Sequence, residues 1–178
     1  MRRVSVIGNA SSGKSTVARA LAARMGVPYV ELDALHWGPN WSQATAAELE
    51  ARVSPTVARD AWVIDGMYWR KLGGLVLRRA ETVVWIDPPF FTMFARLVWR
   101  SITRIAHRTP LSNGNRETFR NAFLSRDSIL LFALRTRPRR RELIEEWLAR
   151  PDFAHLEIVR FSSTDDALRW AERQDRVV

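Results

Sequence analysis

The segment Gly8-Asn9-Ala10-Ser11-Ser12-Gly13-Lys14-Ser15 decides the fold. It fits the phosphate-binding pattern G-x-x-x-x-G-K-[ST] at every fixed position. A β-branched, apolar run (residues 3–8) precedes the pattern, and an amphipathic stretch (residues 13–25) follows it. The pattern therefore lies between a predicted strand and a predicted helix, which is the context its chemistry requires. That context disfavours the alternative of a chance match on a tight turn.

Each residue type in this loop suits the binding of a nucleoside triphosphate. Glycines permit backbone angles that turn successive N–H groups inward around phosphate oxygens, and the following helix adds its partly positive end. Lys14 provides a charge for the β- and γ-phosphates, and Ser15 is the expected Mg²⁺ ligand. We therefore expect ATP and Mg²⁺ as cofactors. The nucleotide-binding residues would be Gly8, Asn9, Ala10, Ser11, Ser12, Gly13, Lys14, Ser15 and Thr16.

Predicted strands alternate with predicted helices along the chain. We expect strands at residues 3–8, 28–32, 62–64, 82–86 and 156–161, and helices at 13–25, 44–59, 90–107, 117–134, 139–149 and 164–173. Residues 36–42 are typical of a loop, and Pro55 argues against an unbroken helix around it. Such alternation predicts an α/β domain over residues 1–178, with a parallel sheet covered by helices on both faces.

Acidic residues follow three of these strands, and ligands of open α/β sheets bind at that edge. Asp33 follows the second strand, where a carboxylate can accept the proton of an acceptor hydroxyl or serve as a helix N-cap. Asp65, followed by Gly66, suits a carboxylate that holds Mg²⁺ through water, although Asp-Gly also forms turns. Asp87 ends the next strand, but two prolines follow it, so Asp65 is the preferred metal residue.

Composition excludes several classes of protein. The chain has no cysteine, which excludes disulfides and Cys-based metal sites. Its three histidines show no metal-ligand spacing. No stretch reaches the roughly 18 apolar residues of a membrane-spanning helix, and the apolar run near the N-terminus is too short for a signal peptide. We therefore expect no membrane span and a cytoplasmic location.

The positive charge is concentrated in one region. The net charge is +9, and residues 96–150 contain thirteen arginines against five acidic residues. Four arginines share one predicted helix face, at positions Arg96, Arg100, Arg104 and Arg108. We expect a helical, arginine-rich lid at about residues 96–135, in which Arg116 and Arg126 close over the transferred phosphate. A solvated basic face, a membrane-surface helix and a nucleic-acid-binding stripe are the competing interpretations.

Two further groups of residues have open interpretations. The dense basic run at 135–141 is read as a solvated or nucleic-acid-facing surface. Trp37, Trp41 and Trp69 lie on predicted loops near the strand ends. They suit stacking in an acceptor pocket, and core packing is an equally good interpretation.

The sequence resembles the adenylate-kinase-like P-loop kinases, most narrowly the branch known as topology-modulation proteins. Besides the phosphate-binding loop, the resemblance rests on segments 29–37, 62–68, 82–89 and 114–128. It covers roughly residues 4–141, and its narrowest segments are Leu32-Asp33-Ala34-Leu35-His36-Trp37 and Gly114-Asn115-Arg116-Glu117. The resemblance implies a five-stranded parallel sheet in the order 2-3-1-4-5 with a helical lid.

The resemblance also bears on the acceptor. Adenylate kinases carry Asp-Gly-Phe-Pro-Arg where this chain has Asp65-Gly66-Met67-Tyr68-Trp69, and Arg70 comes one position late. This departure disfavours AMP as the acceptor. Asp33 matches the position at which shikimate-kinase-like enzymes hold a hydroxylated substrate. The role in DNA topology implied by the branch's name has no basis in the residues themselves.

The main hypothesis is an ATP-dependent kinase of a small-molecule or nucleotide acceptor. Its catalytic residues would be Lys14, Asp33, Arg116 and Arg126, with Ser15 and Asp65 holding Mg²⁺. The second hypothesis is a nucleotide-gated, nucleic-acid-binding regulator that uses the arginine-rich surface. A third, a degenerate kinase fold acting as a binding module, is disfavoured by the intact Lys14, Ser15 and Asp65.

Overall fold

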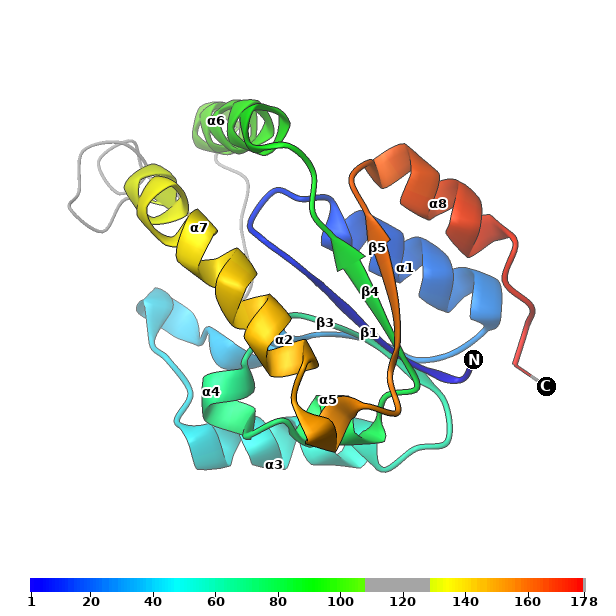
Figure 1. The fold of residues 1–178 in the computed structure, drawn as a ribbon. Helices are drawn as coiled ribbons and strands as arrows, with labels where there is room; N and C mark the ends of the chain where they lie inside the picture. The colour runs from blue at the N-terminus through cyan, green and yellow to red at the C-terminus, as the bar shows by residue number, and fades with distance from the viewer. Residues whose placement is uncertain (108–128, 178) are drawn as a thin grey trace.

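Five parallel strands form the central sheet of the computed structural model, which describes residues 1–107 and 129–177. The strands are β1 (Arg3–Gly8), β2 (Tyr29–Glu31), β3 (Trp62–Asp65), β4 (Thr82–Ile86) and β5 (Glu157–Phe161). Their order is β2-β3-β1-β4-β5, and every neighbouring pair is parallel. This confirms the predicted sheet and its order. The carboxyl ends of β1, β2 and β3 therefore meet at one edge, where the phosphate-binding loop begins (Figure 1).

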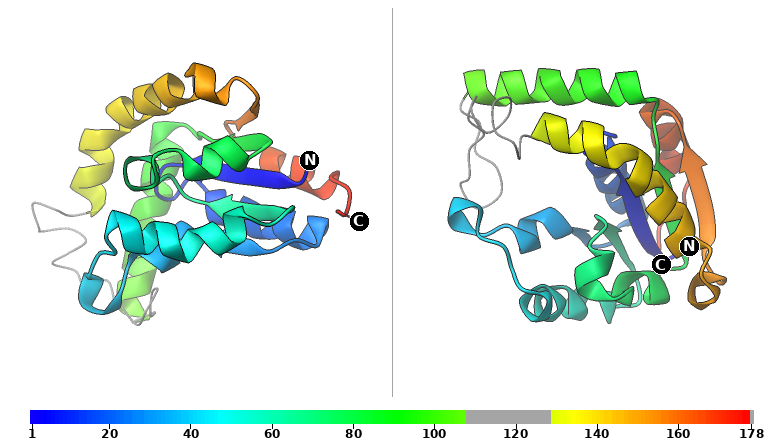
Figure 2. Two further views of the ribbon diagram at one scale, coloured as in Figure 1. Left: turned by 90° about the horizontal axis from the view of Figure 1, so that it is seen from below. Right: turned by 60° about the vertical axis from the view of Figure 1, so that its left-hand side comes forward.

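Helices cover both faces of the sheet (Figures 1 and 2). On one face lie α1 (Lys14–Met25) and α8 (Thr164–Glu172). On the other lie α3 (Ala46–Val57), α4 (Trp69–Leu72), α5 (Leu75–Arg79) and the C-terminal part of α7 (Ile129–Leu148). Successive residues of a strand point to opposite faces, so Val84 packs with the α1 side and Trp85 with the α3 side. The sheet thus separates two apolar clusters.

Two long helices lie beyond the carboxyl edge of the sheet. Helix α6 (Phe90–Ala106) follows β4, and α7 leads back to the core, where Ile144 is buried. Met93 and Leu97 of α6 are also buried, and with Ala10 of the phosphate-binding loop they form a small apolar cluster. Of the expected lid at about residues 96–135, the structure describes the part in α6 and the first residues of α7, whereas Arg108, Arg116 and Arg126 lie outside the described residues.

Several sequence-based boundaries were wrong. A short helix that was not predicted, α2 (Leu32–His36), follows β2, and the segment expected to be a loop, residues 36–42, contains a 3-10 turn, η1 (Pro39–Trp41). Helices α4 and α5 were not predicted at all. Where two helices were expected after residue 117, the described part is one helix, α7, and it continues through Pro138. Likewise α3 continues through Pro55. A proline removes one N–H donor, and the neighbouring turns of both helices hold without it.

The remaining short element is η4 (Pro151–Phe153), which joins α7 to β5. Within residues 1–107 and 129–177, none of the helices is both long enough and apolar enough to cross a membrane.

Candidate active site

The phosphate-binding loop joins β1 to α1 in a backbone conformation that needs two of its glycines. Gly8 and Gly13 have φ angles of 158° and 93°. A Cβ atom at Gly8 would lie 2.5 Å from the carbonyl oxygen of Ile86, and one at Gly13 would lie 2.6 Å from Oγ1 of Thr164. Ser11 also has a positive φ, of 59°. The loop is thus held in a strained turn by close contacts with the ends of β4 and α8.

The residues of this loop fit a bound phosphate chain. Oδ1 of Asn9 and Oγ of Ser11 are buried and have no hydrogen-bond partner among the described residues. Buried polar atoms are normally satisfied, and the Ser11 hydroxyl, which lines the cleft, is free to donate to a phosphate oxygen. The N-terminus of the twelve-residue helix α1 begins at Lys14 and favours an anion at the same place.

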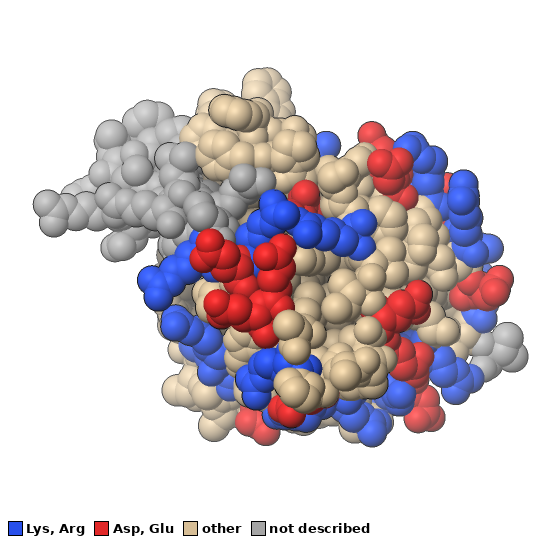
Figure 3. Space-filling view, viewed as in Figure 1, with Lys and Arg blue, Asp and Glu red and all other residues tan. Residues whose placement is uncertain are grey.

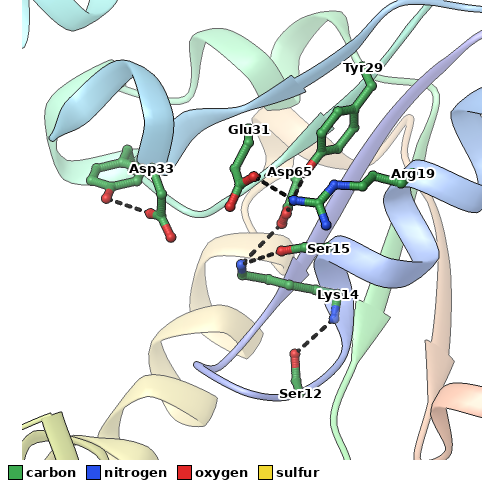
Figure 4. Close-up of polar contacts among 9 residues, drawn as sticks. Ser12, Lys14, Ser15, Arg19, Tyr29, Glu31, Asp33 and Asp65 are labelled. Atoms are coloured by element: carbon green, nitrogen blue, oxygen red, sulfur yellow. Dashed lines mark hydrogen bonds and ion pairs between the residues drawn. The ribbon is translucent and has the colours of Figure 1, made fainter. Parts of the chain in front are cut away.

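Lys14, Ser15 and Asp65 meet at the centre of the site (Figure 4). Lys14 Nζ lies 3.2 Å from Asp65 Oδ1 and 3.4 Å from Ser15 Oγ. Burial raises the pKa of Asp65, and Lys14 partly offsets this effect. Within the described part of the chain, no group of three histidine or acidic side chains forms a metal site. A Mg²⁺ ion here would therefore take Ser15 and Asp65 together with phosphate oxygens and water.

A second carboxylate neighbours Asp65. The hydroxyl of Tyr29 lies 3.3 Å from Asp65 Oδ2 and 3.3 Å from Glu31 Oε2, and Arg19 donates to Glu31 at 2.9 Å. Burial raises the pKa of Tyr29, so its hydroxyl remains a proton donor to these carboxylates. Tyr29 and Glu31 are two residues apart on β2 and so face the same side. The sequence analysis missed Tyr29 and Glu31, although polar side chains at alternate positions of the predicted strand after Pro28 indicate that both face the same side.

Asp33 lies on α2, about one helical turn before Trp37. Its Oδ1 accepts a hydrogen bond from the hydroxyl of Tyr68 at 2.7 Å. The buried ring of His36 packs against Tyr68, with centroids 4.6 Å apart, and against Trp37 at 4.8 Å. Burial, and next Lys71, lowers the pKa of His36, which favours the neutral imidazole. The helix N-cap is Glu31, so Asp33 does not serve as the N-cap.

A cleft of about 570 Å³ connects these groups. The phosphate-binding loop and α1 form one wall, through Ala10, Ser11, Gly13, Lys14, Ser15, Thr16 and Arg19. Glu31, Asp33, Trp37 and Trp41 form another wall, and Arg96, Arg100 and Arg104 line it from α6. Arg96 donates to Thr164 Oγ1 at 2.8 Å, and the same hydroxyl donates to the carbonyl oxygen of Ser12 at 3.2 Å. Helix α6 is thereby joined to the phosphate-binding loop.

The structure brings most of the sequence-predicted site residues together. Lys14, Ser15 and Asp33 line the cleft, and Asp65 is buried in contact with Lys14. Gly8, Asn9 and Ser12 belong to the loop but do not line the cleft. Arg116 and Arg126 lie outside the described residues.

Three residues with open interpretations are now placed. Of the three loop tryptophans, Trp37 and Trp41 line the cleft, whereas Trp69 is buried and packs against Trp147, with ring centroids 5.3 Å apart.

Asp87 lies apart from the P-loop, beside a second cavity of about 430 Å³, where it pairs with Arg160 and lies 3.9 Å from Arg141.

The basic run at 135–141 was expected to be solvated or to face nucleic acid, and for Arg140 this was wrong. Arg140 is half-buried beside Tyr68 and Asp33, and burial lowers its pKa. Nothing in the sequence signals the position of Arg140, because it depends on how α7 packs. Tyr68 was also missed, although its place three residues after Asp65 brings it to the same edge of the sheet.

Comparison with known proteins supports the fold. No family model matches the sequence, and no curated protein matches it. The shikimate kinase from Acinetobacter baumannii, solved in complex with shikimate, superposes with a TM-score of 0.54 at 16% identity, over 97% of this chain and 90% of its own. A gluconokinase from Sinorhizobium meliloti 1021 gives 0.52 at 20% identity, over 96% and 89%. The chain therefore has the fold of the P-loop kinases, while its place in the topology-modulation branch stays a prediction.

Proposed function

We propose that this protein is an ATP-dependent phosphotransferase that phosphorylates a hydroxyl group of a small molecule. One observation carries the proposal. The Lys14–Asp65 pair and the carboxylate of Asp33 lie at the same cleft, so a triphosphate on the loop and an acceptor at Asp33 would meet there. The P-loop kinase fold supports this interpretation.

The donor side uses the phosphate-binding loop. Its backbone N–H groups and the N-terminus of α1 would hold the phosphates, and Lys14 would neutralise the β- and γ-phosphate charge as it leaves Asp65. Ser15, and Asp65 through water, would hold Mg²⁺, which neutralises charge between the β- and γ-phosphates when it is bound. The partnerless Ser11 hydroxyl, which lines the cleft and can donate to a phosphate oxygen, supports a ligand at this loop.

The acceptor side uses Asp33. The acceptor hydroxyl oxygen forms a bond to the γ-phosphorus, and the bond from that phosphorus to the β–γ bridging oxygen breaks, which releases ADP. The hydroxyl proton passes to Asp33 and from there to solvent. Trp37 and Trp41 would form the wall against which the acceptor packs, and the adenylate-kinase acceptor AMP is disfavoured for the sequence reason given above.

The arginines of the lid would stabilise charge on the transferred group. Arg96, Arg100 and Arg104 line the phosphate cleft, and we propose that Arg116 and Arg126 join them from a lid at about residues 96–135 of one domain, 1–178. On the face shown in Figure 3, basic and acidic side chains are intermixed. Because Arg96, Arg100 and Arg104 line the cleft of the phosphate-binding loop, we propose a nucleotide phosphate rather than a nucleic acid as their partner. A cytoplasmic location remains a prediction from the sequence.

A screen for ADP release tests the proposal. Purified protein, ATP and Mg²⁺ are incubated with a panel of hydroxylated metabolites and nucleoside monophosphates, one at a time, and a coupled assay records ADP. We expect one class of acceptor to raise ADP release well above the acceptor-free rate, and the Lys14→Ala variant to abolish the increase. Binding of ATP without acceptor-dependent ADP release from any compound would contradict the proposal.

A further inference from the structure

The carboxylate of Asp33 is already held at one of its two oxygens. Oδ1 accepts a hydrogen bond from Tyr68 at 2.7 Å, which lies within the range of charge-assisted O–H···O contacts. The other oxygen points away from this contact (Figure 4). Asp33 also lines the cleft. Tyr68 thus holds one side of the carboxylate, and Oδ2 is the oxygen without this contact.

Tyr68 is itself held from two sides. Its ring packs against the buried ring of His36, with centroids 4.6 Å apart. Its hydroxyl oxygen also interacts with the Trp37 side chain. An indole N–H can only donate, so Trp37 donates to Tyr68 and Tyr68 donates to Asp33. The three side chains form one directed chain of hydrogen bonds that ends at the carboxylate.

We infer that Tyr68 is a positioning residue for Asp33, whose carboxylate it fixes, together with Trp37, in one orientation toward the acceptor hydroxyl. The inference rests on the proposed function for the role of Asp33 in phosphoryl transfer. The hydrogen-bond chain itself is a property of the folded protein without substrate. A carboxylate held in one orientation favours one hydroxyl of a polyhydroxylated acceptor, because its remaining lone pairs point in fixed directions.

The charged and titratable groups around Asp33 agree with this role. Tyr68 remains a donor throughout the working pH range, because burial and the Asp33 charge raise its pKa. Arg140 of α7 lies beside both Tyr68 and Asp33 and brings positive charge to the carboxylate. His36, on α2 beside Asp33, has a lowered pKa, which favours its neutral form at neutral pH. These groups and the Tyr68 hydrogen bond surround the carboxylate that Tyr68 orients.

The test measures the titration of Asp33 directly. The carboxyl ¹³C chemical shift of Asp33, assigned by comparison with Asp33→Asn, is followed against pH in the full-length wild-type protein and in Tyr68→Phe. The substitution removes the hydroxyl and keeps the ring that packs on His36. Since the substitution removes a hydrogen bond to the carboxylate, we expect the pH dependence of the Asp33 resonance to differ from that of the wild type.

The chain offers a matched control in its only other tyrosine. Tyr29 donates to Asp65 and Glu31 rather than to Asp33, so Tyr29→Phe should leave the Asp33 titration unchanged. An equal Asp33 titration in the wild type and Tyr68→Phe would overturn the inference, and so would an equal shift in both phenylalanine variants. A general loosening of the fold would move many carboxyl resonances, whereas the positioning role moves that of Asp33. The titrations of the wild type and of the two phenylalanine variants need no acceptor, so their outcome is independent of the ADP-release screen.

Discussion

Lys14 and Asp65 form an ion pair at the centre of the candidate active site, with 3.2 Å between Nζ and Oδ1. The Asp65 side chain is fully buried, and that of Lys14 is 16% exposed. Burial disfavours the charged form of Asp65, and the lysine offsets part of this cost. The two residues that would handle the phosphates and Mg²⁺ thus hold each other when no phosphate is bound. Substitution of either one should affect both catalysis and stability.

Replacement of Lys14 by alanine should abolish phosphoryl transfer while the protein stays folded. The variant loses the charge that would stabilise the transferred phosphate, a loss worth at least about 100-fold in turnover. Acceptor-dependent ADP release measures the effect, and circular dichroism checks the fold. Lys71→Ala is the control, because Lys71, the only other lysine, donates to the carbonyl oxygen of Ala44 instead. Full activity of Lys14→Ala would refute the donor-side mechanism.

Replacement of Asp65 by asparagine should change how stability depends on pH. The pKa of Asp65 is raised above its ordinary 3.8 in the folded protein. The folded state therefore retains a proton that the unfolded state releases, and wild-type stability falls as pH rises from 3.8 to the raised folded value. Asp65→Asn removes this loss, so its free energy of unfolding should decline less over that interval. Urea unfolding at a series of pH values measures it, and parallel pH profiles for the two proteins would contradict the assignment.

Much of the fold was predictable because the relevant signals are local. The strand-loop-helix context of Gly8–Ser15 and the four other apolar strands were enough to predict the parallel sheet, and the order followed from the family resemblance. Helices α4 and α5 have only four and five residues, too few for a periodic pattern. Pro55 and Pro138 each remove one backbone N–H donor, but the hydrogen bonds of the neighbouring turns are enough for α3 and α7 to continue through them.

The candidate site was predictable only where its residues follow strand ends or belong to the loop motif. Asp33 and Asp65 could be placed at one edge of the sheet, but their partners could not. The contact of Tyr68 with Asp33 spans 35 positions, and Arg140 reaches the same place from α7. Such contacts depend on the tertiary packing of separate elements, and a single sequence taken alone carries no signal for them.

Replacement of Gly13 by alanine should destabilise the protein more than the same change at Gly26. Both glycines flank α1 and have positive φ angles, of 93° and 70°. A Cβ atom at Gly13 would lie 2.6 Å from Thr164 Oγ1, whereas a Cβ at Gly26 would meet nothing within 4 Å. Both variants bear the left-handed strain, and Gly13→Ala adds an overpacking cost of about 1–3 kcal/mol. Urea unfolding measures the free energy of unfolding of both variants. Equal losses would show that the Thr164 side chain moves aside without an energetic cost.

Removal of the Thr164 hydroxyl should weaken ATP binding, because this hydroxyl connects two parts of the nucleotide cleft. It accepts from Arg96 of α6 at 2.8 Å and donates to the carbonyl oxygen of Ser12 at 3.2 Å. Thr164→Val keeps the shape and removes both contacts, so Arg96 and the Ser12 peptide are no longer held in place. Loss of a hydrogen bond of this kind is worth about 1 kcal/mol, which corresponds to a roughly fivefold higher Kd.

Thr164→Ser separates the hydroxyl from the methyl group in the same experiment. The serine keeps the donor and acceptor of the bridge and loses only a methyl that contributes to packing at α8. We expect the serine variant to bind a fluorescent ATP analogue nearly as tightly as the wild type, while the valine variant binds it several-fold more weakly. If serine weakens binding as much as valine does, then packing of Thr164 under Gly13, rather than the Arg96–Thr164–Ser12 bridge, sets the geometry of the phosphate-binding loop.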